Sequence, residues 1–130
     1  MSSAWPGSVA VTRDELIARA LAFPAAQEDY PFGDDLLTVK VGGRVFAWIP
    51  LGETGWLGRG ARVAVKLPPD LVAELRDAYP DQVSSARPLD ERYWLAVRVG
   101  TSMPESEMAE LLAMSYDEVV QHLPRRHRPN

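Results

Sequence analysis

Two short segments predicted to be strands, separated by the pair Gly42-Gly43, constrain the fold of this chain most strongly. Residues 37–41 follow the two-residue period of a β-strand, and residues 44–49 return as the second strand. A Gly-Gly pair between two such segments is typical of the tight turn of a β-hairpin, because glycine readily takes the positive φ that this turn requires. The sequence therefore predicts an antiparallel sheet, and the rest of the chain must supply the layer that covers it.

Two further strands and three helices are predicted by the same kind of patterning. Residues 62–67 and 93–99 alternate as strands, and Thr12 with Glu15 forms the capping box of a first helix. The three helices are expected at residues 12–23, 68–79 and 102–123. The element order α-β-β-β-α-β-α predicts an α+β fold with an antiparallel sheet of about four strands, covered on one face by helices.

The length of 130 residues and the absence of cysteine limit the possible classes of protein. The length fits one domain, expected over residues 12–124, with a flexible lead-in at 1–11 and a basic tail at 125–130. A chain without cysteine has no disulfide framework, thiolate metal site or cysteine nucleophile. No apolar run is long enough to span a bilayer, and residues 1–12 lack the pattern of a signal peptide. We expect a cytoplasmic monomer.

The charge of the chain is negative overall but unevenly distributed. Fourteen basic and eighteen acidic residues give a net charge of −4, which repels DNA at long range. Residues 36–66, however, hold five basic residues and one acid, whereas residues 104–123 hold five acids and no Lys or Arg. Acids near helix N-termini explain part of this segregation. The other interpretation is a basic strand surface that meets a polyanion.

The alternation within each strand assigns its side chains to one of two sheet faces. If Val41 pairs with Arg44 across the turn, Phe46 and Trp48 share the helix-covered face with the aliphatic residues. The opposite face then carries Lys40, Arg62, Lys66, Arg98 and Trp94. Cations around an aromatic ring suit phosphates and a stacked base. A solvated face whose long side chains cover apolar surface would show the same pattern.

Two flexible segments add further basic and aromatic residues. Residues 52–60 are rich in glycine and carry Trp56 and Arg59, which fits either a projecting wing that contacts nucleic acid or a mobile connector. The tail has the sequence Arg125-Arg126-His127-Arg128, which could bind phosphates or simply form a solvated terminus.

Catalytic and metal-binding patterns do not emerge from the residues. His122 and His127 are separated by a proline and do not share a helix face as a metal pair would. The acidic pairs at 28–29 and 34–35 lack the spacing of a calcium loop, and turn capping explains Asp34 or Asp35. No phosphate-binding loop or nucleophile elbow is present. We therefore predict no catalytic residue, no metal site, no cofactor and no enzymatic activity.

Four segments together resemble the MmcQ/YjbR family. They are Tyr30–Asp35, Val39–Phe46, Arg92–Trp94 and Ser115–Val120, and they occur in the family's order and spacing. The resemblance runs from about residue 13 to 124. It implies a bacterial protein with a compact α+β fold similar to CyaY-like (frataxin-like) domains, described as a "double wing", labelled DNA-binding and without agreed catalytic residues.

The resemblance also transfers to individual positions. The family's segment of a basic residue, a histidine and a tryptophan corresponds here to Arg92, Tyr93 and Trp94, so that tyrosine replaces the histidine. The Gly42-Gly43 turn and the loop 52–60 correspond to the two wings.

These observations lead to one predicted function and two alternatives. The leading prediction is a non-catalytic accessory protein that binds DNA weakly and in a salt-sensitive manner. Its stacking residues would be Trp56 and Trp94, and the residues expected to contact nucleic acid are Lys40, Arg44, Arg59, Arg62, Lys66, Arg92 and Arg98. The alternatives are a protein that holds a small ligand in an aromatic cleft, as a resistance protein would, and a chaperone-like module for a protein partner.

Overall fold

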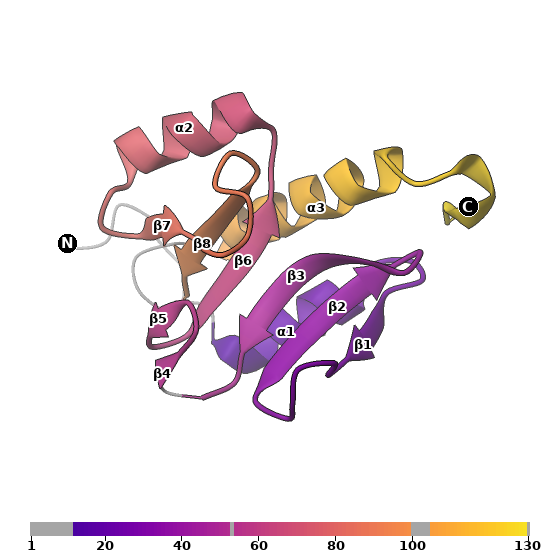
Figure 1. Cartoon of the computed structure of the whole chain (residues 1–130), viewed down its shortest axis with the longest axis horizontal. Coiled ribbons are helices and arrows are strands. Elements are labelled where there is room, and N and C mark those ends of the chain that lie inside the picture. The colour runs from indigo at the N-terminus through magenta and orange to yellow at the C-terminus, as the bar shows by residue number, and fades with distance from the viewer. Residues whose placement is uncertain (1–11, 53, 100–104, 130) are drawn as a thin grey trace.

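The computed structural model describes residues 12–52, 54–99 and 105–129 (Figure 1). The predicted lead-in at 1–11 and Asn130 lie outside the described residues. The helices are α1 (Arg13–Leu21), α2 (Pro69–Ala78), α3 (Glu105–Gln121) and the short 3₁₀ turn η1 (Arg125–His127). The strands are β1 (Gln27–Asp29), β2 (Leu36–Val41), β3 (Arg44–Pro50), β4 (Thr54–Gly55), β5 (Gly58–Arg59), β6 (Arg62–Lys66), β7 (Val83–Ser85) and β8 (Trp94–Arg98).

The main sheet is antiparallel and has the strand order β1-β2-β3-β6-β8-β7, and β4 and β5 form a separate hairpin. The α+β fold is confirmed, but the prediction of about four strands is too low. The additional strands β1 and β7 lie at the two edges and have three residues each. Strands of three residues carry too little alternation to be recognised in a sequence.

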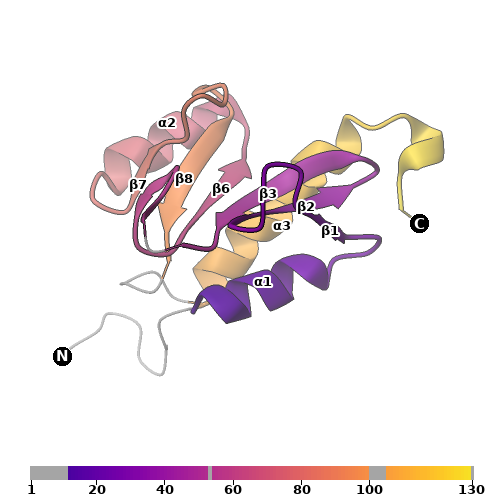
Figure 2. The same cartoon turned by 60° about the horizontal axis from the view of Figure 1, so that its bottom comes forward.

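The main core lies between the sheet and helices α1 and α3 (Figure 2). The capping box predicted at Thr12 and Glu15 is present and starts α1, whose Leu16 and Ala20 are fully buried. From α3, Met108 and Leu112 are fully buried. Burial of such side chains contributes roughly 1.5–3 kcal/mol each. Helix α2 contacts the β7 edge of the sheet, with its residue Val72 buried in the same core.

A β-bulge in β3 changes the predicted side-chain orientation. Val41 pairs with Arg44, as expected from the Gly-Gly turn, but the register shifts between Val39 and Lys40, so that Val39 pairs with Ala47. One extra residue in a strand moves every later side chain to the other face. Trp48 is therefore opposite Thr38 and lies on the face away from α1 and α3. Its predicted position on the helix-covered face is wrong.

Candidate binding cleft between two diverging strands

Strands β3 and β6 are neighbours in the sheet, yet they pair only through Ala47–Val65 and Trp48–Ala64. Beyond this short ladder the two strands diverge, and α3 lies behind the space between them (Figure 1). Regular pairing there would have satisfied the backbone groups of both strands, so a side chain must take its place.

The hydroxyl group of Ser115 on α3 bridges the diverging strands. Its Oγ accepts a hydrogen bond from the Lys66 backbone N–H at 2.8 Å and donates one to the Phe46 carbonyl oxygen at 2.6 Å. Ser115 is fully buried. The sequence places this serine within the apolar stripe of α3, and a lone polar residue in such a stripe is a signal that it satisfies buried backbone groups.

A cleft of about 340 Å³ lies where the strands diverge. Trp48 and Trp94 supply aromatic surface, and Val119 and Leu123 supply aliphatic surface from α3 and the residues after it. The polar and cationic side chains that line it are Arg44, Lys66 and His122. We call this feature the strand cleft. It combines two cations with two indole rings in one concavity, which neither sheet alternation nor motif spacing predicts.

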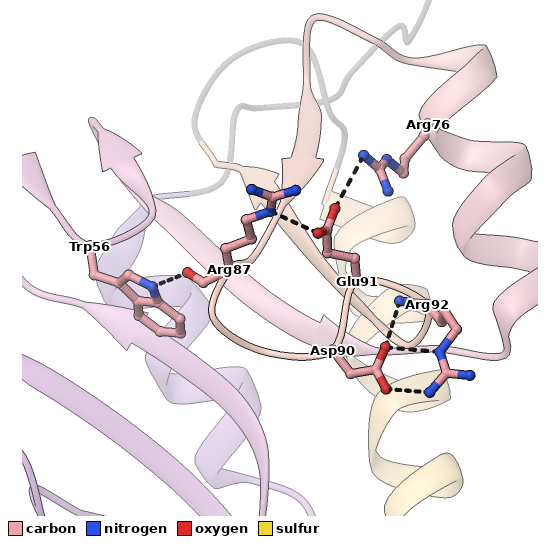
Figure 3. Close-up of polar contacts among 6 residues, drawn as sticks. All are labelled: Trp56, Arg76, Arg87, Asp90, Glu91 and Arg92. Carbon is pink, nitrogen blue, oxygen red and sulfur yellow. Dashed lines mark hydrogen bonds and ion pairs between the residues drawn. The ribbon is translucent and has the colours of Figure 1, made fainter.

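The cations beside the strand cleft differ in how far their charge is neutralised. Arg92 forms a bidentate contact with Asp90, with Nη2 2.8 Å from Oδ2, and these hydrogen bonds lower the pKa of Asp90 to about 2 (Figure 3). Lys66 has no ion pair among the described residues, and its Nζ lies 5.9 Å from the ring centroid of Tyr93. The Arg92 guanidinium lies 5.4 Å from the same ring. Lys66 therefore keeps its positive charge available, whereas Arg92 is largely compensated.

The C-terminal residues, predicted to be a basic tail, form the short turn η1 and contact the hairpin beside the strand cleft while remaining exposed. Arg128 donates from Nε to the Leu123 carbonyl at 3.0 Å and from Nη2 to the Gln121 carbonyl at 2.9 Å, which satisfies the end of α3. A Cβ atom on Gly42 would lie 3.1 Å from the His127 carbonyl oxygen, so the turn at η1 touches the β2–β3 hairpin. Arg125 and Arg126 are thereby brought to the same end of the molecule as Arg44.

His122 follows the last residue of α3 and lies exposed on the rim of the strand cleft. Its Nδ1 is 2.8 Å from the Glu118 carbonyl oxygen, and because a carbonyl only accepts, Nδ1 carries a proton. The side chain of Glu118 is the carboxylate nearest to this ring, with Oε2 4.0 Å from Nδ1.

The centre of the sheet face away from α1 and α3 is apolar and covered. Trp48 contacts Trp56 and Trp94 edge-to-face at 5.5 and 6.4 Å, and Phe32 stacks on it at 5.9 Å. Trp56 donates from its indole N–H to the Arg87 carbonyl, which ties the β4–β5 hairpin to the loop before β8 (Figure 3). Beneath them a second small core buries Leu57, Ala64, Ala86 and Ala96. The predicted basic face is therefore interrupted at its centre by an apolar cluster.

The predicted nucleic-acid contacts are distributed over separate places on this face. Lys40 is paired with Asp29 at 2.7 Å, and its hydrogen bond lowers the pKa of that carboxyl. Arg62 and Arg98 are opposite each other on β6 and β8, at the far end of these strands from Lys66 and Trp94. Burial, with Arg98 nearby, lowers the pKa of Arg62. Arg59 lies in β5, but its side chain is outside the described residues.

Two searches of the described residues bear on the classes of site. Within residues 12–52, 54–99 and 105–129, no group of three or more His, Asp or Glu side chains could hold a metal ion. In the same part of the chain no helix combines the length and apolar character needed to cross a bilayer.

The fold and the strand cleft define a small α+β protein with a six-stranded antiparallel sheet and a concave cationic site at its centre seam. The chain belongs to the YjbR family, whose model matches residues 21–118. It is 30% identical over 118 residues to the Escherichia coli K12 protein named "Uncharacterized protein YjbR", covering 91% of this chain and 95% of that protein.

Solved structures agree with this assignment. A crystal structure from Deinococcus radiodurans, described by the domain name DUF419, has a TM-score of 0.78 and 26% identity, and covers 89% of this chain and 84% of that chain. A Pseudomonas syringae protein has a TM-score of 0.67 with 19% identity, over 83% of this chain and 98% of that chain. The second likeness concerns the fold alone.

Proposed function

We propose that this protein is a cytoplasmic, monomeric and non-catalytic accessory protein that binds nucleic acid weakly through one end of the molecule. The observation that carries the proposal is the gathering of exposed or half-buried cations from three segments at that end. We call it the basic end, and it consists of Arg44, Lys66, Arg125 and Arg126. None of these four has an ion pair among the described residues.

The basic end has the properties that phosphate binding requires. Arg44 begins β3 directly after the hairpin turn, and η1 packs against that turn, so the hairpin and the C-terminal residues project together. A projecting hairpin with basic side chains contacts phosphates without reading sequence. Local concentration of base offsets the net charge of −4 only at short range, so the affinity should be low and strongly salt-dependent.

The arrangement around Ser115 favours binding over catalysis. Its hydroxyl is buried and is engaged with Lys66 N–H and Phe46 C=O on either side. It is therefore held as a structural bridge and does not act as a nucleophile in this proposal.

The test is fluorescence anisotropy of a labelled DNA duplex measured over a range of salt concentrations. With three to four phosphate contacts we expect log K to fall with log salt at a slope of about −3 to −4. Arg44→Ala and Arg126→Ala should each reduce the steepness of that slope by about 1. Arg98→Ala removes the same charge at the far end of β8 and should leave the slope unchanged. No binding at low salt, or an equal effect of Arg98→Ala, would contradict the proposal.

A further inference from the structure

We infer that the strand cleft binds one small ligand that combines a flat aromatic ring with an anionic group, of about the size of a nucleoside monophosphate. The strand cleft shares Arg44 and Lys66 with the basic end but takes a much smaller ligand than a polymer, and the inference holds whether or not the protein binds DNA. Its evidence is the shape, lining and charge of the cleft.

The size of the strand cleft selects a small ligand. Ligand pockets range from about 300 to 1,000 Å³, and the cleft of about 340 Å³ lies near the lower limit. One or two fused rings with a single charged substituent would occupy it. A DNA duplex could contact only its rim.

The two tryptophans of the cleft favour an aromatic ring. Trp48 and Trp94 have ring centroids 6.4 Å apart and an interplanar angle of 81°, so their planes form a corner. A flat ring placed there can stack on one indole and meet the other edge-on, the two preferred geometries of aromatic pairs. Both indoles are held in place: β8 presents Trp94 beside Lys66, and the bulge in β3 turns Trp48 toward the same face.

The charged groups of the cleft favour an anion. Lys66 lies on β6 and Arg44 on β3, so the two diverging strands each contribute one cation. A guanidinium forms bidentate contacts with phosphate or carboxylate, and an ammonium acts as a point charge. Two acids in this region have partners: Asp90 pairs with Arg92, and Glu118 accepts a hydrogen bond from Gln121 Nε2 at 2.8 Å.

The strand divergence is supported by a side chain that replaces two backbone partners. Ser115 satisfies the Lys66 N–H and the Phe46 carbonyl where ladder bonds are absent. The same contact fixes the backbone of Lys66, so its side chain starts from a rigid position at the cleft. Rigid first contacts reduce the entropic cost of binding a small ligand.

Isothermal titration calorimetry with four probes tests the ligand chemistry. Adenosine monophosphate and 1-naphthyl phosphate both carry a ring and an anion, adenosine carries only the ring, and inorganic phosphate only the anion. We expect saturable binding of at least one of the first two. Adenosine, which lacks the charged contact, and phosphate, which lacks the ring contact, should each bind at least about tenfold more weakly. Binding of adenosine monophosphate alone identifies a nucleotide, and binding of 1-naphthyl phosphate identifies an aromatic acid in general.

Three variants locate the site. Lys66→Ala should weaken the binding of the anionic probe about tenfold or more and leave the weak binding of adenosine unchanged. Arg44 lies exposed on the hairpin, so Arg44→Ala gives the same test if Lys66→Ala does not fold. Arg98→Ala is the matched control on the same sheet face and should bind like the unaltered protein.

Three results would overturn the inference. They are failure of both ring-bearing anions to bind, equal affinity for adenosine and its monophosphate, and equal effects of Lys66→Ala and Arg98→Ala. The anisotropy measurement with DNA is independent of these titrations, so failure of polymer binding is distinguishable from failure of the cleft.

Discussion

The two ends of the boundary between β3 and β6 are held together by different groups. At one end the backbones pair through Ala47–Val65 and Trp48–Ala64, and the β4–β5 hairpin covers the face above. At the other end the strands separate and the side chain of Ser115 replaces the missing backbone partners. The difference shows that a sheet can open a cleft without leaving these backbone groups unsatisfied when a helix supplies one hydroxyl.

The same comparison separates two sets of cations. Arg62 and Arg98 face each other at the closed end, where Arg98 contributes to the lowered pKa of Arg62. Arg44 and Lys66 lie on different strands at the open end and line a concave surface with two indoles. Both ends are basic, and the strand cleft of about 340 Å³ lies at the open end. The position of cations relative to the strand divergence therefore matters more than their number.

The substitution Ser115→Ala should have the largest effect on stability, because it removes the group that joins the strands at the open end. It leaves the Lys66 N–H and the Phe46 carbonyl without their partner, and each unsatisfied buried group costs about 1–3 kcal/mol. We expect the free energy of unfolding in urea to fall by about 2–4 kcal/mol. Ser84→Ala, on the exposed side of edge strand β7, should change it by less than about 0.5 kcal/mol. Equal effects of the two substitutions would show that Ser115 does not hold the strands.

Alanine at the two hairpin glycines should distinguish the turn itself from its contact with the C-terminal residues. Both glycines have positive φ, +59° at Gly42 and +82° at Gly43, and alanine there costs about 1–2 kcal/mol. A Cβ on Gly43 meets nothing within 4 Å, whereas one on Gly42 would lie 2.6 Å from Leu123 Cδ1. Leu123 is only 3% exposed and cannot move freely.

We therefore expect Gly42→Ala to lower the unfolding free energy by about 1–2 kcal/mol more than Gly43→Ala, because overpacking is added to the strain of the turn. Urea unfolding of both variants measures the difference. If the two losses are equal, η1 is not docked on the hairpin, and Arg125 and Arg126 do not belong to the basic end.

The sequence predicted the helix-covered side of the molecule well, because burial on one face imposes a regular pattern. The capping box at Thr12, the Gly-Gly turn and the alternation in β6 and β8 all have local causes, and the structure contains each of them. The position of Trp48 could not be predicted, since a one-residue bulge leaves no mark in the composition of β3.

The strand cleft depends on contacts between segments far apart in the chain. Ser115 reaches Lys66 across 49 residues and Phe46 across 69 residues. The alternation correctly places Lys66 and Trp94 on one face, but it gives no information on where two paired strands will diverge. A buried serine in the apolar stripe of α3 was the only local signal, and it indicates a polar partner without naming one.

The smallest expected effect concerns the compensated cation beside the open end. The hydrogen bonds from Arg92 lower the pKa of Asp90 to about 2 from its ordinary value of 3.8. A carboxyl with a depressed pKa favours the folded state above its unfolded pKa, and this contribution is lost as the pH falls from about 3.8 to about 2.

In Arg92→Ala the pKa of Asp90, followed by an NMR titration of its side-chain carboxyl, should rise toward 3.8. The control is Arg76→Ala, because the guanidinium of Arg76 pairs with the neighbouring Glu91. It should leave the pKa of Asp90 unchanged. Because the Arg92–Asp90 pair is exposed and water screens its charges, Arg92→Ala should also leave binding in the strand cleft within about twofold of the unaltered protein, in contrast to Lys66→Ala. A tenfold loss of ligand affinity in Arg92→Ala would mean that Arg92 also supplies positive charge to the strand cleft, in addition to Lys66 and Arg44.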